Sequence, residues 1–336
     1  MPSAIFKCPN SIQFLSFLWT DDVAHVVQEL IGNIVATASS SIPAPQNAAD
    51  ESAPSHLRSA LHIAWTRFLR SKTAIVGLGL ICCLLVTALL ADVLAPYSPY
   101  EVDSDASLST PSRAHPLGTD LLGRDMLSRI IHGSRISLYV GFTSISLAVF
   151  VGIPLGLIAG FYGGKFDLIA MRFMDVILAF PFYLQAIVIM VILGPSTTNA
   201  IIALSIERIP TFARIVRGST LSVREMPYVE ATHALAFSPL RTLFRHVLPN
   251  CLAPIIVAAT FSTATAIIVE ATLSFLGLGT QPPTASWGWD LKQNLTFLEM
   301  NAWLTVFPGI SIFLTVLGFN LLGDGLRDAL DPRLKQ

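Results

Sequence analysis

The segment at residues 230–250, EATHALAFSPLRTLFRHVLPN, carries charges between two long apolar runs, and its interpretation decides the fold class. Ser238 and Pro239 are typical of a helix N-cap followed by the first helical position. The segment therefore predicts a helical hairpin over residues 228–249, in which one short helix is followed by a break and then by a second helix. We expect Pro249 to close the second helix.

The second helix of this hairpin is predicted to be amphipathic. Its apolar residues recur at the spacing of a single stripe: Leu240, Leu243, Phe244, Val247 and Leu248. This spacing leaves Arg241 and Arg245 on a polar side. Taken alone, such a hairpin could read DNA, lie on a membrane surface or dock to another protein.

The composition favours a membrane protein. Of the 336 residues, 53% are hydrophobic and only 13% are charged, and the mean hydropathy is +0.63. These values lie outside the usual range of soluble domains. The formal net charge of -1 argues against nucleic acid as the main partner, since phosphate-binding proteins normally carry a basic excess.

Residues 1–60 differ in composition from the rest of the chain. They are predicted to form a cytoplasmic extension that is partly disordered, because residues 36–55 are rich in Ser, Ala and Pro. A secretory signal needs a basic start and a continuous apolar core, and this region has neither. We therefore expect the extension to stay attached to the apolar domain that follows, residues 61–336.

An all-α membrane protein with six crossings is predicted from apolar runs of about 20 residues, the length that spans a bilayer as a helix. The predicted spans are 74–95, 136–163, 173–194, 197–217, 247–271 and 301–323. The third and fourth spans share one uncharged run over 176–206, which is broken at 194–197. The fourth span is interrupted by Glu207, Arg208 and Pro210.

The distribution of Lys and Arg predicts that both termini are cytoplasmic, because short cytoplasmic connections are enriched in these residues. Six spans with both ends inside place residues 218–248 in the cytoplasm. Exceptions to the bias are Arg113, Arg124, Arg129 and Arg135, which fall in the predicted outer loop after the first span. That loop also carries several Asp residues.

Four glycines recur every four residues in the second predicted span: Gly152, Gly156, Gly160 and Gly164. Such a row lets another helix approach closely, either within the chain or from a second subunit. The Gly-Gly-Lys sequence at its end lacks the rest of a phosphate-binding loop. No metal-ligand spacing is found among the seven His residues, and we expect no metal, no cofactor and no catalytic group.

Ionisable residues inside the predicted spans are candidates for function, because such groups are costly in a bilayer unless they are paired or hydrated. Glu207 and Arg208 lie near the middle of the fourth span, where they could line a polar pathway or form a buried ion pair that fixes packing. Asp175 and Glu270 lie nearer to span ends. For these two we expect structural contacts with headgroups or loop backbone.

Four segments resemble one family, the inner-membrane permease subunits of ATP-binding-cassette (ABC) importers for dipeptides and oligopeptides, which also serve nickel and related solutes. The segments are HPLGTDLLGRDMLSRIIHGSRISLYVG at 115–141, residues 230–250, EATLSFLGLGTQPPTASWG at 270–288 and GDGLRDALDPR at 323–333. Their order and spacing among six spans resemble those of the second permease subunit. The resemblance covers about residues 60–336 and implies the six-helix fold of type I ABC importer permeases.

The resemblance also implies a coupling region, in which two short cytoplasmic helices dock into an ATPase subunit. The matching positions are Glu230, Ala231, Leu248 and Pro249. The family's glycine is replaced by Ala236, where a positive φ costs a non-glycine residue about 1 kcal/mol or more, so we expect the turn to differ slightly.

Implied partners are a second permease, two cytoplasmic ATPases, an extracytoplasmic binding protein and the bilayer of a bacterial inner membrane. The alternative within the family is a permease for nickel or another small solute. A less favoured hypothesis is a proton-driven secondary transporter with Glu207 as carrier. It is disfavoured because no inverted repeat is detectable. An intramembrane hydrolase is disfavoured because no Ser-His or two-Asp arrangement lies at matching depth.

Overall fold

The computed structural model describes residues 65–330, so the predicted extension at 1–60 lies outside the described residues. Within this range the regular elements are helices, with one isolated bridge between Thr119 and Asp125. The long helices are α3 (Lys72–Leu89), α5 (Met126–Tyr162), α6 (Gly164–Ala179), α7 (Phe182–Leu193), α8 (Thr197–Arg224), α11 (Leu248–Leu276) and α13 (Trp303–Leu330). The short helices are α4 (Ala91–Leu94), α9 (Pro227–Ala234), α10 (Pro239–Thr242) and α12 (Trp287–Asn294).

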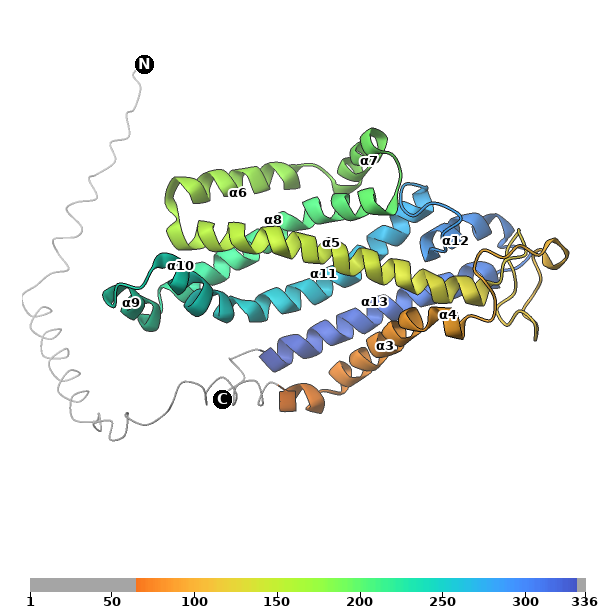
Figure 1. Cartoon of the computed structure of the whole chain (residues 1–336), viewed down its shortest axis with the longest axis horizontal. Coiled ribbons are helices and arrows are strands. Elements are labelled where there is room, and N and C mark those ends of the chain that lie inside the picture. Colours follow the sequence, from red (N-terminus) through yellow and green to blue (C-terminus); the bar gives the residue numbers. More distant parts are fainter. Residues whose placement is uncertain (1–64, 331–336) are drawn as a thin grey trace, which may run out of the picture. The chain divides into compact units, whose positions relative to one another are not determined.

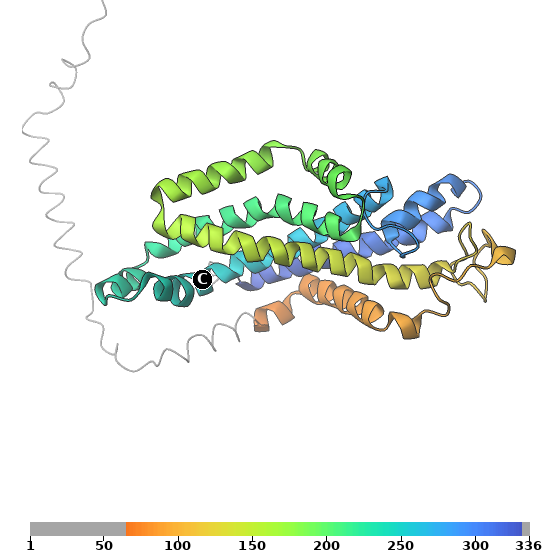
Figure 2. The ribbon, with the colours of Figure 1, turned by 45° about the horizontal axis from the view of Figure 1, so that its top comes forward.

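The long helices lie side by side and run back and forth between two ends of the bundle (Figures 1 and 2). Helices α9 and α10 form one end, while α12 and the loop at 95–125 form the other. The first residue of α3 and the last residue of α13 both lie toward the α9 end. Within residues 65–330 the chain therefore runs six times between these ends, with α6 and α7 together forming the third pass.

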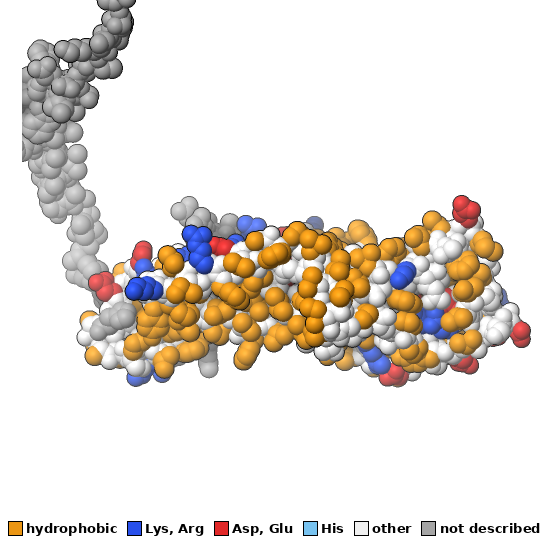
Figure 3. Space-filling model, turned by 90° about the horizontal axis from the view of Figure 1, so that it is seen from above, with side chains coloured by type: hydrophobic (Ala, Val, Ile, Leu, Met, Phe, Trp, Pro, Cys, Tyr) orange, Lys and Arg blue, Asp and Glu red, His pale blue; other side chains and the backbone are white. Residues whose placement is uncertain are grey.

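The surface around these helices is largely apolar, as expected for a bundle in a bilayer. Figure 3 shows hydrophobic side chains over most of one face, on the side of α6 and α7. Four helices, α3, α5, α13 and the continuous helix that ends in α11, are long and apolar enough to cross a membrane, and the bent pair of α6 and α7 would be a fifth. Helix α8 makes the remaining pass and contains Glu207, Arg208, Arg214, Arg217 and Arg224.

The third pass differs from the single helix predicted at 173–194. Helix α6 ends at Ala179, and α7 begins after Pro181 with its axis turned by 85°. Proline disfavours helical backbone in the preceding residue and provides no N–H, so the chain breaks here. The Gln185 amide donates hydrogen bonds to the carbonyls of Ile177 and Phe180, at 2.5 and 2.9 Å. These two carbonyl groups at the break are thus hydrogen-bonded within the chain, as a bilayer requires.

The N-cap predicted in the 230–250 segment is confirmed. The Ser238 hydroxyl accepts a hydrogen bond from the Arg241 N–H, and Pro239 occupies the first turn of α10. The side-chain oxygen of an N-cap residue satisfies one of the free N–H groups at a helix start.

The prediction that Pro249 closes the second helix is wrong. The helix continues from Pro239 to Leu276, and a π-helical turn at Leu243–Val247 (η2) lies just before the proline. Pro249 has no N–H, and its ring would clash with the carbonyl four residues earlier in a regular α-helix. The wider turn accommodates the proline, and the Leu248 N–H bonds to the carbonyl of Leu243. The hairpin is therefore continuous with the fifth pass.

Three of the four regularly spaced glycines bring α5 against α8 of the same chain. A Cβ atom at Gly156 would lie 2.4 Å from the carbonyl oxygen of Ala213. One at Gly152 would lie 2.8 Å from the Cβ of Phe212, and one at Gly160 would lie 2.7 Å from the Cβ of Thr220. Real side chains do not fit at these distances, so the glycines permit the close approach.

Gly164 does not belong to this row. It is the first residue of α6, beyond the end of α5, and it has a φ of +63°. A Cβ at this position would meet no atom within 4 Å. The backbone conformation, rather than close packing, explains why residue 164 is a glycine, because a positive φ strains other residues.

We expect Gly156→Ala to destabilise the subunit by about 1–3 kcal/mol, since the added methyl group forces α5 and α8 apart. Gly79→Ala is the matched control, because a Cβ there meets no atom within 4 Å in α3. The control should be neutral or stabilising by up to about 1 kcal/mol, since alanine is the better helix former. Thermal unfolding in detergent measures both, and equal midpoints would contradict the proposed tight contact.

Candidate functional site

The hairpin of α9 and α10 is anchored to the bundle by its own apolar residues. Val229, Leu243 and Val247 are buried at 0%, 2% and 0% exposure. They join one cluster with residues of α5, α8 and α11: Leu157, Val216, Val223, Cys251 and Ile255. Buried hydroxyls of Thr232 and Thr242 lie 3.1 Å apart and link α9 to α10. The hairpin is therefore a rigid extension of the bundle.

The predicted apolar stripe divides into two faces. Leu243 and Val247 point into the cluster, whereas Leu240 and Phe244 are 64% and 56% exposed. Each pair is four residues apart, so each lies on its own row of the helix. Leu243 is thus not available to a partner, and the outward apolar groups are Leu240 and Phe244.

Most of the remaining candidate residues in this segment are exposed. They are Glu230, Ala231, Ala236, Arg241, Arg245 and Pro249, while Leu248 is half-buried. The guanidinium of Arg241 lies 4.6 Å from the centre of the Phe237 ring, which orders that side chain on the outer surface. The outward face of the hairpin therefore combines apolar groups, two arginines and one carboxylate.

The turn between α9 and α10 keeps the left-handed conformation that normally requires glycine. Ala236 has a φ of +54°, and the Phe237 N–H bonds to the carbonyl of Thr232 at 3.0 Å. The alanine is accommodated at a cost in backbone strain.

Glu207 and Arg208 form an ion pair on α8. The Arg208 Nε and a Glu207 carboxylate oxygen are 2.8 Å apart, and the side chains are 18% and 19% exposed. The pair is thus partly exposed at the surface of the chain rather than enclosed in its core. An open groove of about 460 Å³ also borders α8, lined by Ile215, Ala253, Pro254, Val257, Ala258, Phe261, Arg327 and Leu330.

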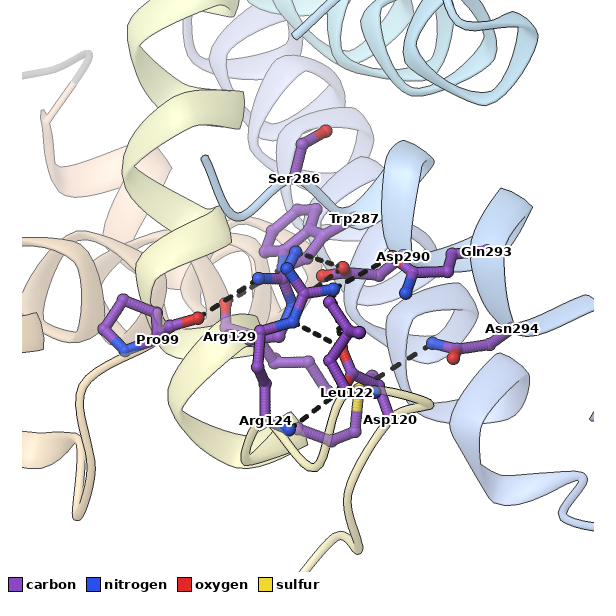
Figure 4. Close-up of polar contacts among 12 residues, drawn as sticks. Pro99, Asp120, Leu122, Arg124, Arg129, Ser286, Trp287, Asp290, Gln293 and Asn294 are labelled. Atoms are coloured by element: carbon purple, nitrogen blue, oxygen red, sulfur yellow. Dashed lines mark hydrogen bonds and ion pairs between the residues drawn. The ribbon is translucent and has the colours of Figure 1, made fainter. Parts of the chain in front are cut away.

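A buried polar network at the α12 end was not anticipated from the sequence (Figure 4). Arg129 donates from Nε and Nη2 to Asp290 at 2.8 and 2.5 Å, and from Nη1 to the carbonyl of Pro99. Both charged side chains are buried, at 0% and 1% exposure. Burial raises the pKa of the Asp290 carboxyl, and the Arg129 charge opposes that rise.

The same network joins the outer loop to α12. Arg124 pairs with Asp120 and also donates to the amide oxygen of Gln293 at 2.9 Å. The indole N–H of Trp287 donates to the carbonyl of Ile130. Three of the four arginines that departed from the inside bias are therefore paired with carboxylates: Arg124 with Asp120, Arg129 with Asp290 and Arg135 with Asp92. The several Asp residues of the loop were the available signal.

Glu270 and Asp175 occupy different environments. Glu270 is fully buried and accepts hydrogen bonds from side chains of Ser274, Thr280 and Ser286. Its contacts are therefore structural, as expected, but they are made with buried hydroxyl groups rather than with headgroups or loop backbone. Asp175 is half exposed and pairs with Arg214 at 2.5 Å. Within residues 65–330, no group of three His, Cys, Asp or Glu side chains is arranged to hold a metal.

The geometry defines a polytopic helical bundle with an anchored hairpin at one end, and sequence comparison gives its class. Residues 152–336 match the family described as binding-protein-dependent transport system inner membrane component. Residues 59–111 match the N-terminal transmembrane domain of oligopeptide transport permease C. The chain belongs to this family of ABC importer permeases, which are multi-pass proteins of the bacterial inner membrane.

Relatives align over most of the chain. The dipeptide transport system permease protein DppC of Alkalihalophilus pseudofirmus is 46% identical over 272 residues, which are 81% of this chain and 90% of that protein. The glutathione transport system permease protein GsiD of Pectobacterium atrosepticum is 44% identical over similar shares of 81% and 90%. An inward-facing structure of the MetNI methionine ABC transporter aligns with a TM-score of 0.50 and 21% identity, covering 61% of this chain and 98% of that chain. This last likeness supports the type I permease fold alone.

Ala236→Gly tests the strain in the hairpin turn. We expect the substitution to stabilise the subunit by about 1 kcal/mol, because glycine adopts the observed φ without steric cost. The control is Ala234→Gly in the last turn of α9, where the loss of a helix former should be neutral or destabilising. Thermal unfolding of both variants gives the comparison, and a destabilised Ala236→Gly would show that the turn carries no strain.

Proposed function

We propose that this chain forms one half of the translocation pathway of a peptide importer, as its second permease subunit. The proposal is supported by relatives named for dipeptide, di/tripeptide and glutathione transport. These names favour peptides over the nickel alternative. The rival proton-driven transporter is also disfavoured, because the family works with a binding protein and an ATPase.

The partners that this function needs are a second permease, two cytoplasmic ATPases and an extracytoplasmic binding protein. ATP hydrolysis belongs to the ATPases, and the permease itself carries out no chemical step. In this arrangement the α9 end faces the cytoplasm and the α12 end faces outward. Closure of the ATPases pushes on the hairpin and tilts the helices between inward and outward openings.

The observation that carries this proposal is the two-faced hairpin. Its inner face is fixed in the bundle by Leu243 and Val247, while Leu240 and Phe244 project outward. Large apolar side chains on a rigid cytoplasmic projection are typical anchors for a partner groove. Arg241, Arg245 and Glu230 are exposed beside them and form the rim of the contact.

The continuity of the hairpin with α11 gives it a mechanical role. Because α10 runs through the π-helical turn into the fifth pass, a displacement at Leu240 or Phe244 is transmitted along a single helix. Cluster contacts with α8 carry the same displacement to a second helix. The hairpin can therefore move the part of α8 that holds Glu207 and Arg208.

For the pathway itself, we place the Glu207–Arg208 pair toward the permeating solute or the partner permease. Ionisable side chains that stay partly exposed in a mid-bilayer helix need a polar or protein neighbour. If lipid took the place of such a neighbour, the Glu207–Arg208 pair would have no polar contact outside itself.

We expect Phe244→Asp and Leu240→Asp to abolish uptake and release the ATPases from membranes, since an unpaired charge in a packed groove costs several kcal/mol. Glu230→Gln should weaken uptake more mildly. The experiment uses the assembled importer, with uptake of a labelled dipeptide and co-purification of the ATPases as readouts.

Leu243→Ala is the matched control for these outward changes. It opens a cavity in the cluster and should lower thermal stability by about 2–5 kcal/mol, yet assembled complexes should retain their ATPases. Leu298→Asp at the opposite end, also exposed, controls for a surface charge. Full ATPase retention and normal uptake in Phe244→Asp would remove the coupling assignment.

We expect Glu207→Leu to impair transport, while Glu207→Gln preserves assembly and changes transport or its coupling to ATP hydrolysis. Leucine leaves Arg208 without its partner at bilayer depth, which is costly. Uptake and ATPase rates in reconstituted vesicles separate the two effects. Wild-type transport by Glu207→Leu would show that this carboxylate faces neither the solute nor the partner.

A further inference from the structure

A fully buried carboxyl group lies near the α12 end of α11, outside the surfaces considered so far. Glu270 has 0% exposure, and the ion pairs of the described residues do not include it. Its neighbours are hydroxyl groups from three places: Ser274 on α11, Thr280 in the following loop and Ser286 just before α12. A hydroxyl of α5, Ser137, lies beside the same carboxyl.

The hydrogen bonds are divided unevenly between the two oxygens of this carboxyl. Oε1 accepts from Ser274 at 2.8 Å, from Ser286 at 3.2 Å and from Thr280 at 3.4 Å. Oε2 is buried and has no hydrogen-bond partner, and the Ser137 hydroxyl oxygen is likewise buried without one. Buried polar atoms are normally satisfied, so the two unpartnered atoms of these adjacent side chains require an explanation.

A hydrogen bond between Oε2 and the Ser137 hydroxyl satisfies both atoms, and the carboxyl group is its donor when Glu270 is neutral. A protonated carboxyl has one O–H donor and keeps acceptor capacity on its other oxygen. With the proton on Oε2, the group donates to Ser137 Oγ while Oε1 still accepts from the three hydroxyls. An ionised carboxylate would instead be a buried charge without a cationic partner, which is far more costly.

We propose that Glu270 is held as a neutral carboxylic acid that donates a hydrogen bond to Ser137, and that it acts as a positioning residue for the outward end of the permease. The group ties α11 to α5 and to both ends of the loop at 277–286. Thr280 extends the connection, since its hydroxyl lies 3.1 Å from that of Thr197 at the start of α8. The acid thus joins three of the passes at one point.

The packing around this loop supports a single fixed arrangement. The Thr280 N–H donates to the Ser274 hydroxyl at 2.9 Å. A Cβ at Gly288 would lie 2.1 Å from the carbonyl oxygen of Ala271, and one at Gly279 would lie 2.4 Å from Ser274 Oγ. Because the backbone approaches α11 this closely, a shorter or charged group at position 270 has no space to reorganise.

The test compares three variants in the assembled importer. Glu270→Gln should keep uptake within about twofold of the wild type, because the amide oxygen accepts and the amide N–H₂ donates to Ser137. Glu270→Asp should reduce uptake about tenfold or more, because it is one methylene shorter and loses the bond across to α5. Glu270→Ala should lose uptake for the same reason.

Infrared difference spectra supply a readout that does not depend on the transported solute. At neutral pH the wild type minus Glu270→Gln spectrum should contain the C=O stretch of a protonated carboxylic acid, which shifts in D₂O and in Ser137→Ala. Glu299→Gln is the control, because Glu299 is exposed and should contribute only carboxylate bands. These spectra remain informative even if the importer carries a solute other than peptides.

Two results would overturn the proposal. One is the absence of the acid band, with carboxylate bands lost in Glu270→Gln, which would show an ionised group balanced by a bound cation. The other is transport that survives Glu270→Asp but not Glu270→Gln, since only an ionised carboxylate explains that order.

Discussion

The close contact between α5 and α8 is the constraint on which the rest of the bundle depends. At Gly152, Gly156 and Gly160 the backbone of α5 approaches α8 so closely that no side chain fits between them. Helix–helix association in a bilayer relies on packing rather than on the exclusion of water. The contact orients α8, and with it the Glu207–Arg208 pair and the cluster that anchors the hairpin.

A second constraint acts on the charged groups, which are paired differently at the two ends. At the α12 end, Arg129 and Asp290 are enclosed and join segments 161 positions apart in sequence. At the α9 end, Asp167 pairs with Arg217 and Asp175 with Arg214, and these pairs remain partly exposed between α6 and α8. Breaking an enclosed pair leaves a buried charge and costs far more than breaking an exposed one. The enclosed Arg129–Asp290 pair therefore holds the α12 end together more firmly than these partly exposed pairs hold α6 to α8.

Sequence rules that depend on neighbouring residues predicted caps correctly. They failed where contacts with distant parts of the chain determine which side chains are buried. The Ser238 cap needs only its own turn, and it is present. Separating Leu243 from Leu240 requires knowing that α5 and α8 lie beneath the hairpin, and the sequence pattern places both leucines on one apolar stripe. The partners of Glu270 were not foreseen for the same reason, because Thr280 and Ser286 return to it through a loop.

The two prolines show how one local rule leads to opposite outcomes. Pro181 breaks the third pass, with Gln185 satisfying the freed carbonyls, whereas Pro249 is absorbed by a π-helical turn and the helix continues. The difference lies in the neighbours. Residues Leu243 and Val247 on either side of the widened turn are fixed in the cluster with α5 and α8, which holds the helix in line, while α7 has few buried residues to hold it against α6. Packing thus determines that the hairpin at the α9 end is rigidly continuous with α11, and that the third pass bends.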